Sequence, residues 1–271
     1  MNSKSISVAI AAVGLLLSAG AGAVEPVDKF QVSLGSYLVN HDVDLQWNSP
    51  ELGAGSRINF KRDLGFDDSE SDYIWSLGGT IGQHHKLSAF GYRYDSDGER
   101  LLAEDFVIDD AEFPSEAAFA GHLDVKVTGI AYTWLFHHGE RSAAGVGIGA
   151  VRYDVSADLA AASLTGEGTV TIEKKLAEDA WAPMLRAEYN RSLAEHWRMG
   201  GQISYVKKSG GDTSGDAIDA NVRLEYFPWE NFGFGLHYNY NDVDLDFDRS
   251  RFNGSVNLKN RGPQLVATLR F

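Results

Sequence analysis

The last eight residues of the chain alternate between apolar and polar side chains. The apolar positions of this segment are Leu265, Ala267, Leu269 and Phe271. The positions between them are Gln264, Val266, Thr268 and Arg270, of which only Val266 is apolar. A period of two predicts a β-strand with one apolar face. Such a strand at a free edge in water would promote aggregation, whereas closure of a barrel in lipid removes the edge. The pattern therefore predicts the closing strand of a transmembrane β-barrel.

The same alternation recurs in segments of about 9–11 residues, the length that a tilted membrane strand needs. It is clearest in 180–190, 196–207 and 218–226. Tyr132, Trp134 and Phe136 fall on one face of another segment, 123–136, as in an aromatic girdle. We expect an all-β, antiparallel up-and-down barrel of ten strands, with eight or twelve as alternatives. The expected strands are 29–39, 73–82, 86–95, 123–136, 142–154, 180–190, 196–207, 218–226, 232–240 and one that ends at Phe271.

The segment 40–71 decides between ten and twelve strands. It contains two short strand-like pieces, 43–47 and 57–60, separated by Pro50, Gly53 and Gly55. The tight turn at 83–85 should be periplasmic, because short turns lie on that side of bacterial barrels. An odd number of strands must then precede Tyr73. We therefore interpret 40–71 as an extracellular hairpin and not as two further spans.

Long loops are expected on the outer side, at 96–121 and 155–179. Acidic residues concentrate in 67–72, 95–112 and 242–248, which we interpret as water-exposed loops. An alternative is that these acids share divalent cations with lipopolysaccharide, since carboxylates suit Mg²⁺ or Ca²⁺. The apolar positions change parity between Tyr240 and Val243, which predicts a β-bulge or the extracellular rim.

The N-terminus has the features of a secretory signal peptide. Lys4 supplies a positive charge, 8–17 is an apolar run too short to span a membrane, and Ala21-Gly22-Ala23 fits a cleavage site. We expect residues 1–23 to be removed and 24–271 to form the barrel domain. No other apolar run approaches the ~18 residues of a membrane helix. The sequence has no cysteine, so it contains no disulfide.

Together, the alternating strands and the terminal Phe271 resemble the outer-membrane β-barrel proteins of Gram-negative bacteria. The segment 55–66, followed by His85-Lys86-Leu87, is similar to a pattern in small uncharacterised barrels of this kind. The resemblance implies location in the cell outer membrane, contact with its lipid and lipopolysaccharide, and assembly with periplasmic chaperones and the barrel-assembly machinery. It also implies that Phe271 is the signal which that machinery reads. Asp63-Leu64-Gly65 is expected either to cap the barrel mouth or to lie in an ordinary loop.

The chain contains 38 acidic and 24 basic residues, and its formal net charge is −14. Nucleic acid is therefore not an expected partner. The strand patterns nevertheless place a mixed polar network on the lumen face of four strands. Its members are Arg186, Glu188, Arg198, Asp219, Arg223, Glu225 and His237. Charges in a narrow lumen must be paired or hydrated. They form either an ion-pair lattice that fills the lumen or a polar path for small solutes, and polar lining alone does not imply conduction, because side chains can fill a small barrel.

Catalysis in an outer-membrane barrel would need a histidine beside a nucleophile or a carboxylate near the outer leaflet. His84, His85, His137, His138 and His196 fall in expected periplasmic turns, and the two adjacent pairs are a weak metal signal. Two sets remain as hypotheses. They are His41 with Asp42 and Asp44, and Ser204 with Glu225 and His237.

These observations favour a monomeric outer-membrane barrel with a structural or surface-interaction role. We expect no enzymatic activity, no catalytic residue, no metal and no cofactor. A porin-like passive pore for small polar solutes is the second hypothesis, and an outer-leaflet lipid-modifying enzyme is the third.

Overall fold

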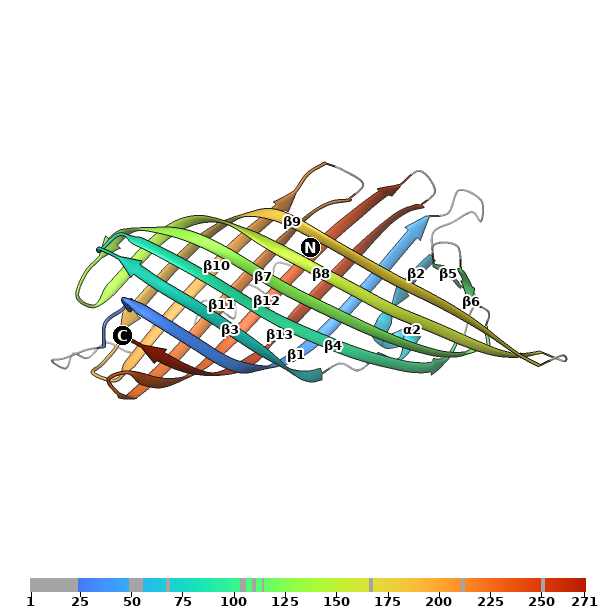
Figure 1. Ribbon diagram of the computed structural model, residues 1–271, viewed down its shortest axis with the longest axis horizontal. Coiled ribbons are helices and arrows are strands. Elements are labelled where there is room, and N and C mark those ends of the chain that lie inside the picture. The colour runs from blue at the N-terminus through green and yellow to red at the C-terminus, as the bar shows by residue number, and fades with distance from the viewer. Residues whose placement is uncertain are drawn as a thin grey trace, which may run out of the picture.

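A computed structural model shows a closed antiparallel β-barrel (Figure 1). It describes residues 24–48, 56–66, 69–102, 106–108, 111–113, 115–165, 168–210, 213–249 and 252–271. Ten strands form the wall, as predicted. They are β1 (Phe30–Asn48), β3 (Ser69–Ile81), β4 (His85–Leu101), β7 (Ala118–His138), β8 (Ser142–Thr165), β9 (Gly168–Ser192), β10 (Trp197–Lys208), β11 (Thr213–Trp229), β12 (Phe232–Arg249) and β13 (Phe252–Arg270). The barrel closes where β1 pairs with β13, from Gln31 opposite Arg270 to Asn48 opposite Asn253.

The two longest connections, between β1 and β3 and between β4 and β7, lie at the same end of the barrel, so we assign that end to the exterior and the opposite end to the periplasm. The C-terminal Phe271 lies at the periplasmic end (Figure 1). Its backbone N–H donates to Phe30 O at 2.8 Å, and the Phe30 N–H donates to Phe271 O at 3.0 Å. No helix in the described part of the chain is long and apolar enough to cross a membrane.

The segment 40–71 forms an extracellular hairpin, as predicted, within its described residues. β1 continues without interruption to Asn48, and β2 (Ser56–Asn59) pairs antiparallel with its outer part. The short helix α2 (Phe60–Leu64) follows β2. A second small hairpin, β5 (Phe106–Ile108) with β6 (Ala111–Phe113), lies between β4 and β7.

Several expected loops are strands instead. The segment 155–179 is β-structure at every described position, because β8 and β9 are 24 and 25 residues long. The expected loop at 96–121 shortens in the same way, since β4 reaches Leu101 and β7 begins at Ala118. The acidic segment 242–248 belongs to β12. The wall therefore extends well beyond the length that a bilayer requires, and many acids lie on strand surfaces and not in loops.

The interior of the barrel changes from polar to apolar between two neighbouring rows of inward-facing residues, which lie two positions apart along each strand. One row of directly opposed, inward-facing residues is mostly polar: His41, Asn260, Asn241, Asp219, Ser204, Arg186, Gly147 and Thr133. From β1 through β13 to β7, the next row outward is apolar: Val43, Leu258, Val243, Ala217, Val206, Met184, Gly149 and Ala131. Beyond it, an apolar core fills the outer half of the barrel.

The outer surface changes in the opposite sense. In the inner half, apolar side chains project outward, including Ile148, Leu185, Ile203, Leu236 and Leu265, each more than half exposed. The girdle residues Tyr132, Trp134 and Phe136 also face outward, as predicted. Farther out, β12 presents Asp242, Asp244 and Asp246 to the surface. The exposed apolar belt matches lipid, and the charged band beyond it matches water.

Of the two predictions made from the parity change in β12, the β-bulge is wrong. Its ladder with β13 runs in one register from Phe232 to Arg249, without a bulge. Val243 is buried, so it lies on the same inward face as His237 and Asn239. The apolar residues appeared to change sides because the strand leaves the lipid and its inward face becomes the apolar one.

The segment 60–66 caps the outer core. Leu64 and Phe66 are buried in it, and the Phe66 ring lies 5.1 Å from that of Phe60 and 6.4 Å from that of Phe119, measured between centroids. A Cβ added to Gly98 would lie 2.5 Å from the Phe66 ring, so a side chain there would displace it. Of the two expectations for this segment, the cap is the one that the structure supports.

We predict that Val243→Asp destabilises the barrel by about 3 kcal/mol, because it buries a carboxyl group in the apolar outer core. The control is Asp246→Val on the outward face of the same strand, which should change the free energy of unfolding by less than about 0.5 kcal/mol. Urea unfolding of the two variants in lipid vesicles measures both. A larger loss in the control would mean that the two faces are assigned the wrong way round.

Candidate functional site

The seven predicted lumen residues lie on four adjacent strands. Arg186 and Glu188 are on β9, Arg198 is on β10, Asp219, Arg223 and Glu225 are on β11, and His237 is on β12. Each shares the inward face of its strand with buried neighbours. They separate into a periplasmic group around Arg198 and a central group around Arg186.

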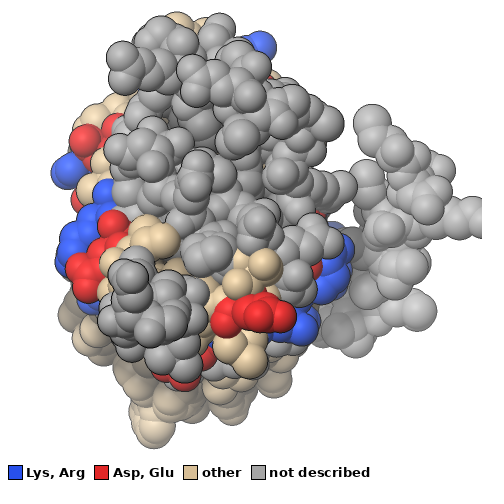
Figure 2. Space-filling model, turned by 90° about the vertical axis from the view of Figure 1, so that its right-hand side faces the viewer, with Lys and Arg blue, Asp and Glu red and all other residues tan. Residues whose placement is uncertain are grey.

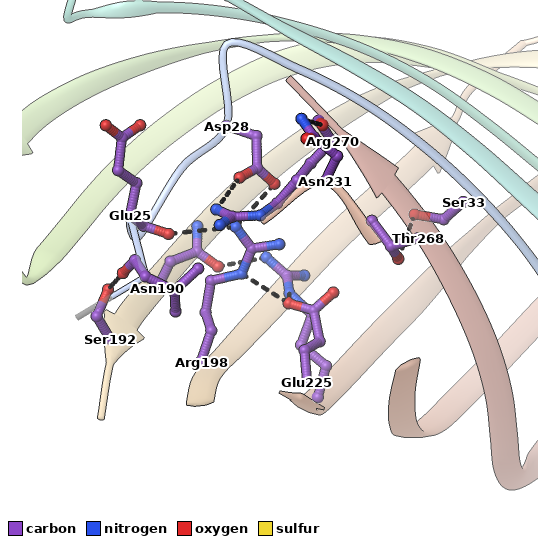
Figure 3. A network of polar contacts seen from close by, with 12 residues as sticks. Glu25, Asp28, Ser33, Asn190, Ser192, Arg198, Glu225, Asn231, Thr268 and Arg270 are labelled. Carbon is purple, nitrogen blue, oxygen red and sulfur yellow. Dashed lines mark hydrogen bonds and ion pairs between the residues drawn. The ribbon is translucent and has the colours of Figure 1, made fainter. Parts of the chain in front are cut away.

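Arg198 organises the periplasmic group (Figure 3). Its Nε donates to Glu225 Oε2 at 2.8 Å, and its Nη1 donates to Asp28 Oδ2 at 2.8 Å. Asp28 also accepts from Arg270 Nη1 at 3.1 Å. The guanidinium carbons of Arg198 and Arg270 lie 4.8 and 4.6 Å from the centroid of the Phe227 ring. Two carboxylates and one aromatic face thus neutralise and orient the buried Arg198 and the partly buried Arg270.

Asp28 comes from the segment before β1, which folds into the periplasmic end of the barrel. Val24 N–H donates to Glu195 O at 3.1 Å, and Arg198 Nη1 donates to Glu25 O at 3.3 Å. Val27 is buried against Leu135 and Ala143. The segment 24–28 is therefore part of the material that fills this end of the lumen.

The central group contains a second buried ion pair. Lys86 Nζ lies 2.8 Å from Glu188 Oε1, and both side chains are largely buried. Arg186 Nε donates to Ser204 Oγ at 3.3 Å and its Nη1 donates to Ser88 Oγ at 3.2 Å. Asp219 accepts from Asn239 Nδ2 at 3.2 Å.

A cavity of about 160 Å³ remains between the two groups and the apolar outer core. We call it the central cavity. Its walls include Lys86, Arg186, Arg223, Asp219, Glu225 and His237. Its volume matches the ~150 Å³ of an engineered cavity that admits one benzene molecule, but its lining is polar. It can hold several waters or one small solute.

Neither catalytic hypothesis is assembled in the structure. His237 Nε2 lies 3.9 Å from Glu225 Oε1, while Ser204 Oγ is bound by Arg186. His41 faces inward, with its Nδ1 2.8 Å from Asn260 Oδ1. Asp42 and Asp44 face the other way and both accept hydrogen bonds from Asn59.

The remaining histidines lie at the barrel ends. Those of the periplasmic turns make local contacts, such as His84 Nδ1 with Leu135 O at 2.7 Å and His137 Nε2 with Ser142 Oγ at 2.9 Å. On the exterior, Asp97 hydrogen-bonds to His122 and raises the pKa of that imidazole. Within the described residues, no three His, Asp or Glu side chains gather in a way that could hold a metal ion.

Sequence reasoning missed three members of the lumen network. Asp28 precedes the first strand and Arg270 belongs to the closing strand. Lys86 is the second residue of β4, directly after a turn. Strand alternation in β4 and β13 could have placed Lys86 and Arg270. Nothing in the sequence before β1 indicated that the chain folds back into the lumen.

Comparison with known proteins supports the fold. The outer membrane protease OmpT from Escherichia coli matches with a TM-score of 0.51 and 9% identity, over 94% of this chain and 100% of that chain. The outer membrane protein OprG from Pseudomonas aeruginosa matches with a TM-score of 0.39 and 10% identity, over 92% and 99%. The P. putida toluene transporter TodX gives 0.36 and 8%, over 90% and 91%. No protein-family model and no curated protein sequence matches the chain.

The closed barrel with its apolar belt is that of an integral outer-membrane β-barrel. At 9% identity, the likeness to OmpT shows the fold and not the activity.

We predict that Asp28→Asn destabilises the barrel by about 3 kcal/mol, because it leaves the buried Arg198 and the partly buried Arg270 with one carboxylate fewer. The matched control is Asp158→Asn, which removes an exposed carboxylate 3.5 Å from Lys175 and should have no measurable effect. Urea unfolding in vesicles compares the two. Equal stability of Asp28→Asn and the unmodified protein would contradict the network described above.

Proposed function

We propose that this protein is a non-conducting outer-membrane barrel that binds an extended polypeptide outside the cell through the free edge of β9. The proposal depends on one observation. From Gly168 to Pro183, β9 pairs with β8 on one side and, among the described residues, forms no ladder on the other, while the short strand β6 lies close to β9.

The free edge exists because neighbouring strands differ in height. The ladder between β9 and β10 ends where Met184 faces Val206, and β10 itself ends at Lys208. β8 and β9 continue together to Thr165 and Gly168. In Figure 1 the β8–β9 pair runs past the other strands toward the exterior end.

The backbone direction of this edge follows from one hydrogen bond. Ser192 N–H donates to Arg141 O at 2.9 Å, toward β8. The β8–β9 register is unbroken, so all even-numbered residues of β9 direct their N–H and C=O groups to β8. The odd-numbered residues, including Thr171, Lys175, Ala177 and Asp179, therefore direct theirs to the free edge. This row can pair with an added strand, as in recognition by β-augmentation.

Charge on the edge supports selectivity. Glu173, Lys175 and Asp179 are exposed on one face of this segment, so it carries charges of both signs. Charged residues on an edge strand discourage indiscriminate pairing, and like charges placed directly opposite are unfavourable. A partner strand with the complementary order of charges is favoured. Figure 2 shows acidic and basic side chains close together at this end of the molecule.

The filled lumen supports a role without conduction. The apolar core and the α2 cap occupy its outer half, and the segment 24–28 with the Arg198 ion pairs occupies its periplasmic end. We also propose that the protein has no catalytic role. This is supported by the separation of His41 from Asp42 and Asp44, and by the hydrogen bond that Ser204 accepts from Arg186.

We predict that Ala177→Pro abolishes peptide binding without unfolding the barrel. Proline removes an N–H that faces the free edge and leaves the ladder to β8 intact. A phage-displayed library of extended peptides, selected on the folded protein in detergent, provides the probe. A selected peptide should slow amide exchange at the odd-numbered residues between 169 and 181.

The control is Ala177→Val, which keeps the N–H and should retain binding of the same peptide. If Ala177→Pro binds the selected peptides as tightly as the unmodified protein does, recognition does not use this edge. If no selected peptide binds the folded protein, the proposed function fails.

We predict that the protein, reconstituted as residues 24–271 in a planar bilayer, gives no discrete conductance steps. Reproducible steps that change ion selectivity in Arg223→Gln would instead favour the passive pore. Heat-modifiable migration in gel electrophoresis verifies that the reconstituted protein is folded.

A further inference from the structure

We propose that the central cavity binds a small anion, held by Arg186 and Arg223 inside the membrane-embedded part of the barrel. This inference does not depend on the proposed function, because it concerns the interior and not the extracellular edge.

The buried charge of the lumen does not balance. The described inward-facing residues of the inner half include five cations, Lys86, Arg186, Arg198, Arg223 and Arg270, and four carboxylates, Asp28, Glu188, Asp219 and Glu225. One positive charge therefore remains if His237 is neutral. In an interior surrounded by lipid, an uncompensated charge is costly. A bound anion would remove this cost.

The excess charge faces the cavity. Three cations, Lys86, Arg186 and Arg223, line it together with two carboxylates, Asp219 and Glu225. Glu225 already lies 2.8 Å from Arg198, and Lys86 lies 2.8 Å from Glu188 behind the cavity wall. Most of the negative charge is thus committed to cations other than Arg186.

Arg186 has no carboxylate within 4.0 Å in the described part of the chain. Its contacts are the two hydroxyl groups of Ser88 and Ser204, the sulfur of Met184 at 3.8 Å, and the ring of Phe90, whose centroid lies 4.7 Å from the guanidinium carbon. All four are neutral, although Arg186 is only 6% exposed. Both hydroxyl groups accept from Arg186, and that of Ser88 donates in turn to Ala131 O at 3.5 Å.

Arg223 provides the second cation. Its Nη2 donates to the side-chain oxygen of Asn190, and its Nε lies 3.9 Å from Glu225 Oε2, which is longer than a hydrogen bond. Asp219 lies in the same register row as Arg186 with Ser204 between them. It therefore offsets part of the Arg186 charge from a distance and should weaken anion binding.

The ligand is small and monovalent. The cavity volume of about 160 Å³ admits a halide with several waters, or one small carboxylate. The apolar outer core lies on one side of the cavity and the Asp28–Arg198 ion pair lies toward the periplasmic end. We expect the anion to be bound when the barrel is refolded in its presence.

The test uses bromide as the probe. The barrel is refolded from urea in sodium bromide, exchanged into bromide-free buffer and crystallised, and anomalous scattering locates the ion. We expect one bromide in the central cavity, in contact with the Arg186 and Arg223 guanidinium groups. Arg186→Gln should lose this ion, whereas Arg261→Gln, on the outward face of β13, should keep it.

A second variant should raise the bromide affinity instead of lowering it. It tests the proposal even if Arg186→Gln does not fold. Asp219→Asn removes a nearby negative charge, so it should increase the bromide affinity by about tenfold or more. The affinity is measured from the dependence of the urea midpoint on bromide concentration during refolding. An empty or water-filled cavity, together with a midpoint that is the same in bromide and in gluconate, would overturn the proposal. The peptide-binding and conductance results would be unaffected by that outcome.

Discussion

Each wall strand passes from lipid into water along its length, and its hydrogen-bond ladder continues without a break. In lipid, every backbone group must be paired within the barrel, and the outward side chains must be apolar. Outside the bilayer the outward side chains meet water, and the core must be apolar. The chain meets both conditions by reversing the polarity of its two faces between the rows that contain Asn241 and Val243, with the β12–β13 register unchanged. The inner half is thus a polar-cored membrane barrel, and the outer half is packed like the barrel of a soluble protein.

This reversal explains how far the sequence could predict the fold. Alternation with apolar residues outward identified each strand inside the lipid, and the parity argument gave the correct count of ten. Beyond the lipid, alternation continues but polar residues face outward, so the segments 155–179 and 242–248 were interpreted as loops. Hydrophobic pattern alone does not reveal which solvent each face meets. An abrupt parity change with strand-forming residues on both sides, as at Asn241 to Val243, is the signal that distinguishes an emerging strand from a bulge.

The lumen residues were predictable from the alternation of side chains along the strands. The filling of the periplasmic end by the segment 24–28 was not. Alternation placed Arg186, Arg198 and Glu225 on inward faces, because a charged side chain on a lipid-facing position would be costly. It could not show that Asp28 lies 2.8 Å from Arg198, since the contact joins residues separated by 170 positions. Long-range pairing of buried charges depends on the three-dimensional path of a segment with no periodic pattern. The consequence is large, because the contact fixes the segment 24–28 in the periplasmic end.

The free edge of β9 and the polarity reversal begin at the same place. The last pair between β9 and β10 is Met184 with Val206, and both residues belong to the first apolar row of the interior. An unpaired strand edge cannot lie in the hydrocarbon of the bilayer, because its N–H and C=O groups would have no partners. The ladder therefore has to persist through the lipid and can end only where water is available. Trp181 lies three residues from Met184 in β9 and is exposed on the outward face. An aromatic residue is typical of this position, where the bilayer meets water. Three independent features, the end of the ladder, the change of the core and the aromatic residue, thus locate the outer boundary of the membrane on this side of the barrel. The unpaired edge of β9 therefore begins at the surface of the lipid.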